Sequence, residues 1–188
     1  VKYELSKTGF TLLPHQVDAI KWMIKREMLT KSNGEARKGP YGGILADDMG
    51  LGKTLETIGL LLGKGHSKTL IIVPANLISQ WKGEFKKFAP HITIVEDIKQ
   101  HTDDTVIIMS YIKAIRSQYV RDYDWNRIIL DEAHYIRNPK GTVHKDILKL
   151  TATSRWCLTG TPIQNYLSDV CSLLAFIGIR KKKYEDLE

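Results

Sequence analysis

Short apolar segments alternate with stretches of helical pattern along the 188 residues of this chain. The apolar segments lie at residues 43–46, 70–73, 92–95, 106–109, 128–130 and 156–158. They lack the strict apolar–polar alternation of a strand with one wet face, so each is expected to be a strand buried on both faces. Helical spacing is found at residues 14–29, 53–62, 76–88, 142–150 and 165–177. This order predicts an α/β fold in which a mostly parallel sheet carries helices on both faces.

Length and composition narrow the class of protein. At about 100–200 residues per domain, residues 1–188 are expected to form one domain. No apolar segment approaches the ~18–20 residues that a membrane span requires, so we expect neither a transmembrane protein nor a membrane partner. The two cysteines, Cys157 and Cys171, cannot build a disulfide framework and are expected to be small buried residues. The net charge of +7 is compatible with a polyanionic partner.

The segment Asp47-Asp48-Met49-Gly50-Leu51-Gly52-Lys53-Thr54 joins an apolar segment to a helical one and predicts a phosphate-binding loop. Gly50 and Gly52 let backbone amides turn toward a polyphosphate, and the positive end of the following helix points at the same anion. Lys53 can reach the β- and γ-phosphates, and the Thr54 hydroxyl can ligate Mg²⁺. Taken alone, the segment could also be an exposed turn with a surface lysine. A dinucleotide fingerprint is excluded because residue 55 is not a third glycine.

A second segment, Ile128-Ile129-Leu130-Asp131-Glu132-Ala133-His134, ends an apolar strand in two carboxylates. In an open parallel sheet, ligands bind beyond the carboxyl ends of the strands. Asp131 is therefore expected to hold Mg²⁺ through water, and Glu132 to orient and deprotonate the water that attacks the γ-phosphate. The alternative is a helix N-terminus decorated with acids.

A third segment, Leu158-Thr159-Gly160-Thr161-Pro162, leads from an apolar run into a polar turn. The small hydroxyl residues Thr159 and Thr161, with Gly160 between them, could sense the γ-phosphate and pass the signal to a neighbouring domain. Taken alone, this segment is simply a turn.

Together, the three segments closely resemble the helicase-like ATPases of superfamily two, and among these best the Swi/Snf family of double-stranded-DNA translocases. The resemblance is carried by residues 43–54, 129–134 and 158–165, and it extends from about Leu12 to Ile179. It implies the fold of a RecA-like P-loop NTPase lobe, with ATP and Mg²⁺ as ligands and double-stranded DNA as partner. Lys53, Asp131 and Glu132 would be its catalytic residues.

The resemblance also implies roles for residues outside these segments. Gln16 would read the adenine base, since a glutamine amide offers both a donor and an acceptor. Two segments would contact nucleic acid, the first through Pro74, Asn76 and Gln80 and the second through Ser110 and Tyr111. Two alternatives stay open: Trp81 has the helical spacing of a core residue, and Lys82, Lys86 and Lys87 could be a solvated helix face. The segment Arg137-Asn138-Pro139 would help to place DNA or a second lobe.

The resemblance further implies a second, C-terminal RecA-like lobe as a partner within the same protein. A first residue of Val suggests a longer parent chain, and no second-lobe motif occurs here. We therefore expect the N-terminal lobe alone, with weak nucleotide binding and little hydrolysis by itself. Chromatin or DNA-repair proteins would be further partners, in the nucleus of a eukaryote or otherwise in the cytoplasm. The alternatives are a strand-separating DNA or RNA helicase, a nucleotide-gated binding module without catalysis, and a P-loop kinase of small molecules.

Overall fold

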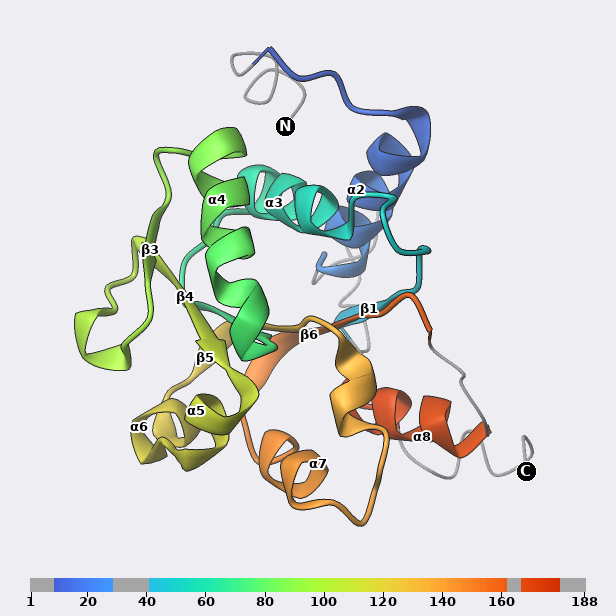
Figure 1. Ribbon diagram of the computed structural model, residues 1–188, viewed down its shortest axis with the longest axis vertical. Coiled ribbons are helices and arrows are strands. Elements are labelled where there is room, and N and C mark those ends of the chain that lie inside the picture. The colour runs from blue at the N-terminus through green and yellow to red at the C-terminus, as the bar shows by residue number, and fades with distance from the viewer. Residues whose placement is uncertain (1–8, 29–40, 162–166, 180–188) are drawn as a thin grey trace.

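The computed structural model describes residues 9–28, 41–161 and 167–179, and within them six parallel strands form one sheet (Figure 1). The strand order is β1-β6-β5-β2-β4-β3. The strands are β1 (Tyr41–Leu45), β2 (Thr69–Val73), β3 (Thr93–Val95), β4 (Thr105–Ser110), β5 (Trp125–Leu130) and β6 (Ala152–Leu158). Every strand pairing is parallel. The predicted α/β class is confirmed.

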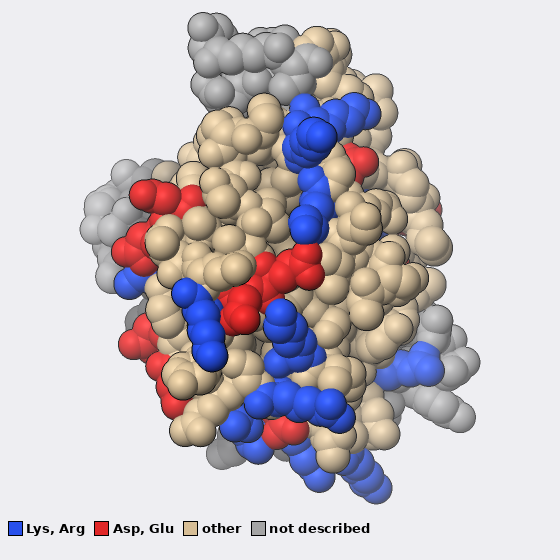
Figure 2. All heavy atoms as spheres, turned by 60° about the vertical axis from the view of Figure 1, so that its left-hand side comes forward, with Lys and Arg blue, Asp and Glu red and all other residues tan. Residues whose placement is uncertain are grey.

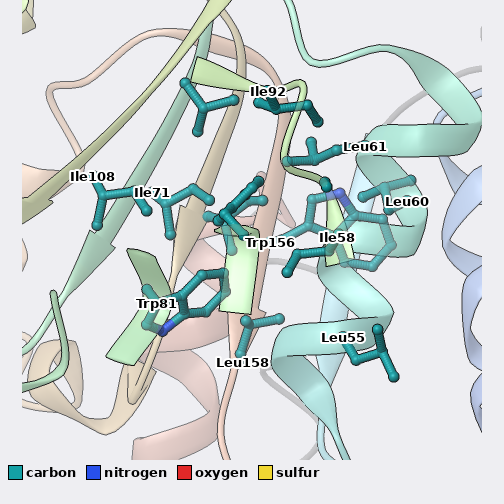
Figure 3. Packing of buried hydrophobic residues seen from close by; sticks show 14 of the residues in the cluster. Leu55, Ile58, Leu60, Leu61, Ile71, Trp81, Ile92, Ile108, Trp156 and Leu158 are labelled. Atoms are coloured by element: carbon teal, nitrogen blue, oxygen red, sulfur yellow. The ribbon is translucent and has the colours of Figure 1, made fainter. Parts of the chain in front are cut away.

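Helices cover both faces of the sheet, as the two-sided apolar strands predicted. One face carries α2 (Pro14–Arg26), α3 (Lys53–Lys64) and α4 (Ile78–Phe88), and the other carries α5 (Tyr111–Arg116), α6 (Gln118–Asp122), α7 (Thr142–Ile147) and α8 (Leu167–Phe176). Successive residues of β2 serve the two faces in turn, since Ile71 packs in the first core and Leu70 and Ile72 in the second. Figure 3 shows the first core, where Ile58 of α3 packs near Trp156 of β6.

Some boundaries differ from the sequence predictions. Residue Asn76 is not the cap of a helix over 76–88, because it lies inside a short 3-10 helix, η1 (Ala75–Leu77), and α4 begins only at Ile78. The helices α5 and α6 were missed, since six and five residues are too few to show a helical period. Of the two cysteines, Cys157 is buried as predicted, whereas Cys171 is half-buried. Within the described residues, no helix is long and apolar enough to cross a membrane.

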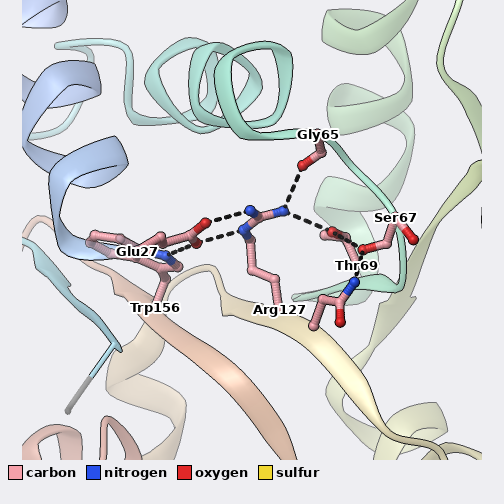
Figure 4. Close-up of polar contacts among 7 residues, drawn as sticks. Glu27, Gly65, Ser67, Thr69, Arg127 and Trp156 are labelled. Atoms are coloured by element: carbon pink, nitrogen blue, oxygen red, sulfur yellow. Dashed lines mark hydrogen bonds and ion pairs between the residues drawn. The ribbon is translucent and has the colours of Figure 1, made fainter. Parts of the chain in front are cut away.

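A buried polar network joins four segments at the amino end of the sheet (Figure 4). The guanidinium of Arg127 in β5 donates to both carboxylate oxygens of Glu27, which follows α2, with a distance of 2.6 Å from Nε to Oε1. Its Nη1 donates to the Gly65 carbonyl and the Thr69 hydroxyl, both at 3.0 Å. Glu27 also accepts a hydrogen bond of 2.8 Å from the indole of Trp156. Three further groups, the Gly65 carbonyl, the Thr69 hydroxyl and the Trp156 indole, thus help to satisfy this buried ion pair, as its burial requires.

Candidate nucleotide-binding site

The loop between β1 and α3 has the backbone that the glycines predicted. Gly50 and Gly52 adopt positive φ angles of 87° and 99°. Gly52 is also the N-cap of α3, so the unpaired amides of the first helical turn point out of the helix at this loop. A Cβ atom on Gly52 would lie 2.4 Å from Nε2 of Gln16, so a side chain here would have to displace the Gln16 amide. The sequence therefore folds into a cradle suited to an anion.

The ammonium group of Lys53 lies across this loop. Its Nζ donates to the carbonyl oxygens of Asp47, at 2.6 Å, and Asp48, at 3.0 Å. The positive charge is thereby held at the loop on which it would meet a phosphate.

A pocket of about 460 Å³ brings the principal predicted residues together. Its lining includes Gln16, Met49, Gly50, Gly52, Lys53, Thr54, Gln80, Asp131 and Glu132. The loop between β1 and α3 and the end of β5 thus meet in one site, although more than seventy residues separate Thr54 from Asp131 in sequence. This is the arrangement expected where parallel strands end together.

Asp131 directly follows β5 and is 8% exposed. Its Oδ1 accepts a hydrogen bond of 2.9 Å from the Glu132 amide, and its Oδ2 accepts one of 2.7 Å from the indole Nε1 of Trp81. Burial raises the pKa of the Asp131 carboxyl, while the Trp81 hydrogen bond acts in the opposite direction. The carboxylate is thus held by two donors and still offers lone pairs to the pocket.

Glu132 has a left-handed backbone, with φ 49° and ψ 51°. Such a conformation is uncommon outside glycine and costs about 1–3 kcal/mol. Its Oε2 lies 3.2 Å from Nδ1 of His134. Strain of this size is typical of residues whose direction matters for function.

The predicted coupling residues lie beside the phosphate loop. The Thr159 amide donates to the Leu45 carbonyl at 3.1 Å, so the end of β6 is fixed to the end of β1. The Thr159 hydroxyl accepts a hydrogen bond from the Thr161 amide. A Cβ atom on Gly160 would lie 3.1 Å from the Met49 side chain. The structure therefore places this segment against the loop, while a signalling role stays a prediction.

Gln16 lies in the wall of the pocket with its amide engaged. Its Nε2 donates to the Leu51 carbonyl at 3.1 Å, and its Oε1 accepts from the Leu13 amide at 3.0 Å. Each amide atom retains the capacity for one further hydrogen bond. Base reading by Gln16 stays a prediction.

The residues predicted to contact nucleic acid divide into two groups. Asn76 and Gln80 are exposed and Ser110 is half-buried, and Gln80 also lines the nucleotide pocket. Pro74 and Tyr111 are buried, so their side chains offer little surface to a nucleic acid, and a contact at either residue stays a prediction. Both side chains are buried because each residue directly follows a strand of the core, Pro74 after β2 and Tyr111 after β4.

The core alternative for Trp81 is confirmed, since its side chain is 1% exposed.

The charged face of the molecule is shown in Figure 2, where basic and acidic side chains are interleaved. Lys82 pairs with Glu96 at 2.7 Å. This lysine therefore belongs to a surface ion pair, whatever else it contacts.

One unusual residue escaped the sequence analysis. Glu56, in the first turn of α3, is fully buried, and neither carboxylate oxygen has a hydrogen-bond partner within the described structure. Burial, and after it the negative charge of Asp47, raises the pKa of Glu56 from 4.5 to about 8. The sequence feature that could have indicated it is a single acidic residue within the mostly apolar segment 55–62.

The donors in the pocket suit both expected ligands. The Thr54 hydroxyl and the Asp131 carboxylate are hard oxygen ligands of the kind that Mg²⁺ prefers. Lys53 and the N-terminus of α3 complement the negative charge of a polyphosphate.

Residues 15–187 match the sequence profile of the SNF2-related domain. The chain belongs to this family. SNF2-related domains are the ATPase domains of helicase-like proteins, and the RecA-like fold agrees with that family. The chain resembles the Sulfolobus solfataricus SWI2/SNF2 ATPase core in complex with dsDNA, with a TM-score of 0.77 and 31% identity over 90% of this chain.

Relatives of this SNF2-related domain come from viruses, fungi and plants. A probable global transactivator of Orgyia pseudotsugata multicapsid polyhedrosis virus is 36% identical over 90% of the chain. Helicase SWR1 of Cryptococcus neoformans is 37% identical over 89%, and ATP-dependent DNA helicase DDM1 of Arabidopsis thaliana is 34% identical over 90%. The chain spans 36% of the viral relative and 36% of the archaeal structure.

Proposed function

We propose that this chain is the N-terminal ATP-binding lobe of a motor that moves along duplex DNA and remodels chromatin or other protein–DNA complexes. One observation carries the proposal: Lys53, Thr54, Asp131 and Glu132 line a single pocket at the N-terminus of α3. A phosphate-binding loop beside two carboxylates is the arrangement typical of proteins that hydrolyse nucleotides.

Each of these residues has a defined part in the proposed reaction. Lys53 and the amides at the start of α3 bind the β- and γ-phosphates of ATP. Thr54 and Asp131 would hold Mg²⁺, which when bound neutralises phosphate charge. Glu132 accepts a proton from the attacking water and orients it.

Turnover is proposed to require a second lobe of the same protein. Gly160 lies so close to Met49 that an added Cβ atom would be 3.1 Å from the Met49 side chain, so a movement of the phosphate loop would reach the segment after β6. In related phosphoryl-transfer systems, an arginine supplied from elsewhere raises the rate by about 10³–10⁵. We therefore infer that the isolated chain binds nucleotide weakly and hydrolyses it slowly.

Duplex DNA is the proposed track. The likeness to an archaeal SWI2/SNF2 core whose structure holds dsDNA supports this choice. Contacts would go to phosphates, so binding would be independent of sequence and weaken steeply with salt. Chromatin or repair factors are the further partners that the relatives suggest, with action in the nucleus of a eukaryote and otherwise in the cytoplasm.

The test uses two variants in the longest natural protein that contains this chain. Lys53→Ala is expected to abolish ATP binding, whereas Glu132→Gln should retain binding and lose turnover. ATPase rates are measured with duplex DNA, single-stranded DNA and RNA. Stimulation by duplex DNA supports the proposal. Stimulation by single strands or RNA alone would indicate a strand-separating helicase, and unchanged turnover in Glu132→Gln would refute the assigned base.

A further inference from the structure

Two buried aromatic side chains from different helices converge on Asp131. The indole Nε1 of Trp81, in α4, donates to the carboxylate oxygen Oδ2 at 2.7 Å. The hydroxyl of Tyr111, at the start of α5, donates to the Asp131 backbone carbonyl at 2.7 Å. The two donors therefore hold both the side chain and the backbone of the same acidic residue.

The surroundings make these hydrogen bonds effective. Trp81 is 1% exposed and Tyr111 is 3% exposed, so water cannot replace either donor. An indole nitrogen can only donate, and the Tyr111 hydroxyl meets a backbone carbonyl oxygen, which can only accept. Both groups are therefore permanent donors toward Asp131.

The direction of the carboxylate depends on these contacts. Oδ2 is held by Trp81 and Oδ1 by the Glu132 amide, so the carboxylate cannot rotate without losing both hydrogen bonds, of which the one from Trp81 is buried. The remaining lone pairs are free for a ligand in the pocket that Asp131 lines together with Lys53 and Thr54. Partners behind a metal ligand commonly fix its orientation in this way.

We propose that Trp81 and Tyr111 are positioning residues that hold Asp131 in the orientation needed to bind Mg²⁺ together with nucleotide. The proposal rests on the proposed function, because it concerns the same pocket. A displacement of the start of α4 or α5 would move a donor on which Asp131 depends.

The first test compares two buried tryptophans in the chain. Trp81→Phe keeps the aromatic packing and removes the donor, and Trp125→Phe is the matched control. Trp125 is 2% exposed, its indole donates to the Val120 carbonyl at 3.0 Å, and it does not line the pocket. Binding of a fluorescent ATP analogue is titrated with and without Mg²⁺.

We expect Trp81→Phe to weaken Mg²⁺-dependent binding by about 10–100-fold, the usual effect of losing such a partner. Binding without Mg²⁺ should change little, and Tyr111→Phe should shift Mg²⁺-dependent binding in the same direction. Trp125→Phe should match the wild type in both measurements. Equal binding by Trp81→Phe and the wild type, or an equal loss in Trp125→Phe, would overturn the positioning role.

A second measurement needs no substitution. The indole N–H resonances of Trp81 and Trp125 are followed by NMR in the wild-type chain as Mg²⁺ and nucleotide are added. The Trp81 resonance should shift while that of Trp125 stays in place, and an unmoved Trp81 resonance contradicts the proposal. A folded wild type that binds no nucleotide with Mg²⁺ would instead refute the proposed function itself.

Discussion

Three acidic residues around the phosphate loop have conformations or surroundings that reduce the stability of the folded chain. Glu132 has a left-handed backbone, Asp131 is buried, and Glu56 is buried with no hydrogen-bond partner in the described structure. Their cost is compensated by the apolar cores on both faces of the sheet. Two of the three, Asp131 and Glu132, line the nucleotide pocket, and strained or desolvated acids are typical of a functional site.

The buried Glu56 predicts a pH dependence of stability. Its pKa is raised to about 8 in the folded chain from an ordinary 4.5, so the folded state holds this proton more tightly than the unfolded state. The free energy of unfolding should therefore fall as pH rises from 4.5 to about 8. Glu56→Gln should remove this decline and be more stable at the upper end by about 1–3 kcal/mol.

Urea unfolding across this pH range measures the effect. Asp104→Asn, at an exposed position, serves as the control and should follow the wild type. A Glu56→Gln variant with the same pH dependence as the wild type would show that this carboxyl does not titrate as its surroundings indicate.

Individual residues also show which contacts could be predicted from the sequence and which could not. The convergence of Lys53 and Asp131 was predictable, because the carboxyl ends of parallel strands meet at one edge. The hydrogen bond from Trp81 to Asp131 was not, since it joins residues 50 positions apart whose side-chain directions depend on tertiary packing. The burial of Tyr111 was missed for the same reason.

At the scale of elements, the phosphate loop is braced from three sides. Gln16 of α2 donates to the Leu51 carbonyl, Lys53 of α3 donates to two loop carbonyls, and Gly160 packs against Met49. The loop therefore keeps its shape through contacts with two helices and the segment after β6.

Alanine substitutions at the two loop glycines should separate strain from crowding. Gly50 has a positive φ but open space, so Gly50→Ala should cost only the ~1–2 kcal/mol of a left-handed residue. In Gly52→Ala the new Cβ would also meet Nε2 of Gln16 at 2.4 Å. We expect a larger loss of unfolding free energy and weaker nucleotide binding for Gly52→Ala, measured by urea unfolding and titration. Equal losses would mean that Gln16 moves aside freely.

At the scale of the whole molecule, the proposed nucleotide site and the buried ion-pair network lie at opposite ends of the sheet. The nucleotide pocket lies beyond the carboxyl ends of the strands. The network of Arg127, Glu27 and Trp156 lies toward their amino ends and ties α2 to β5 and β6. The apolar segments predicted the parallel sheet but not its strand order, because an apolar segment does not indicate which other strands it pairs with.

Breaking this network should destabilise the chain without changing the pocket. Arg127→Met leaves Glu27 buried without its cation, which should cost about 3–5 kcal/mol of unfolding free energy. Nucleotide affinity of the folded fraction should stay unchanged. The double variant Glu27→Gln, Arg127→Met should regain part of the loss, because Gln can still accept from Trp156. Urea unfolding and nucleotide titration check both points, and a weaker affinity in Arg127→Met would contradict this separation.

The strand order also predicts the order in which parts of the sheet form during folding. In the described sheet β1 pairs only with β6, with Tyr41 opposite Ser154. The strands β5, β2, β4 and β3 lie next to one another in that order, and the last of them in sequence ends at Leu130. Pulsed hydrogen exchange during refolding should therefore show β1 amides protected together with those of β6, and protection of β1 first would contradict this order. A ribosome makes the phosphate loop early, but Thr159 and Gly160, which lie against the end of β1 and the loop, follow only after β6, so this side of the nucleotide site is completed late in synthesis.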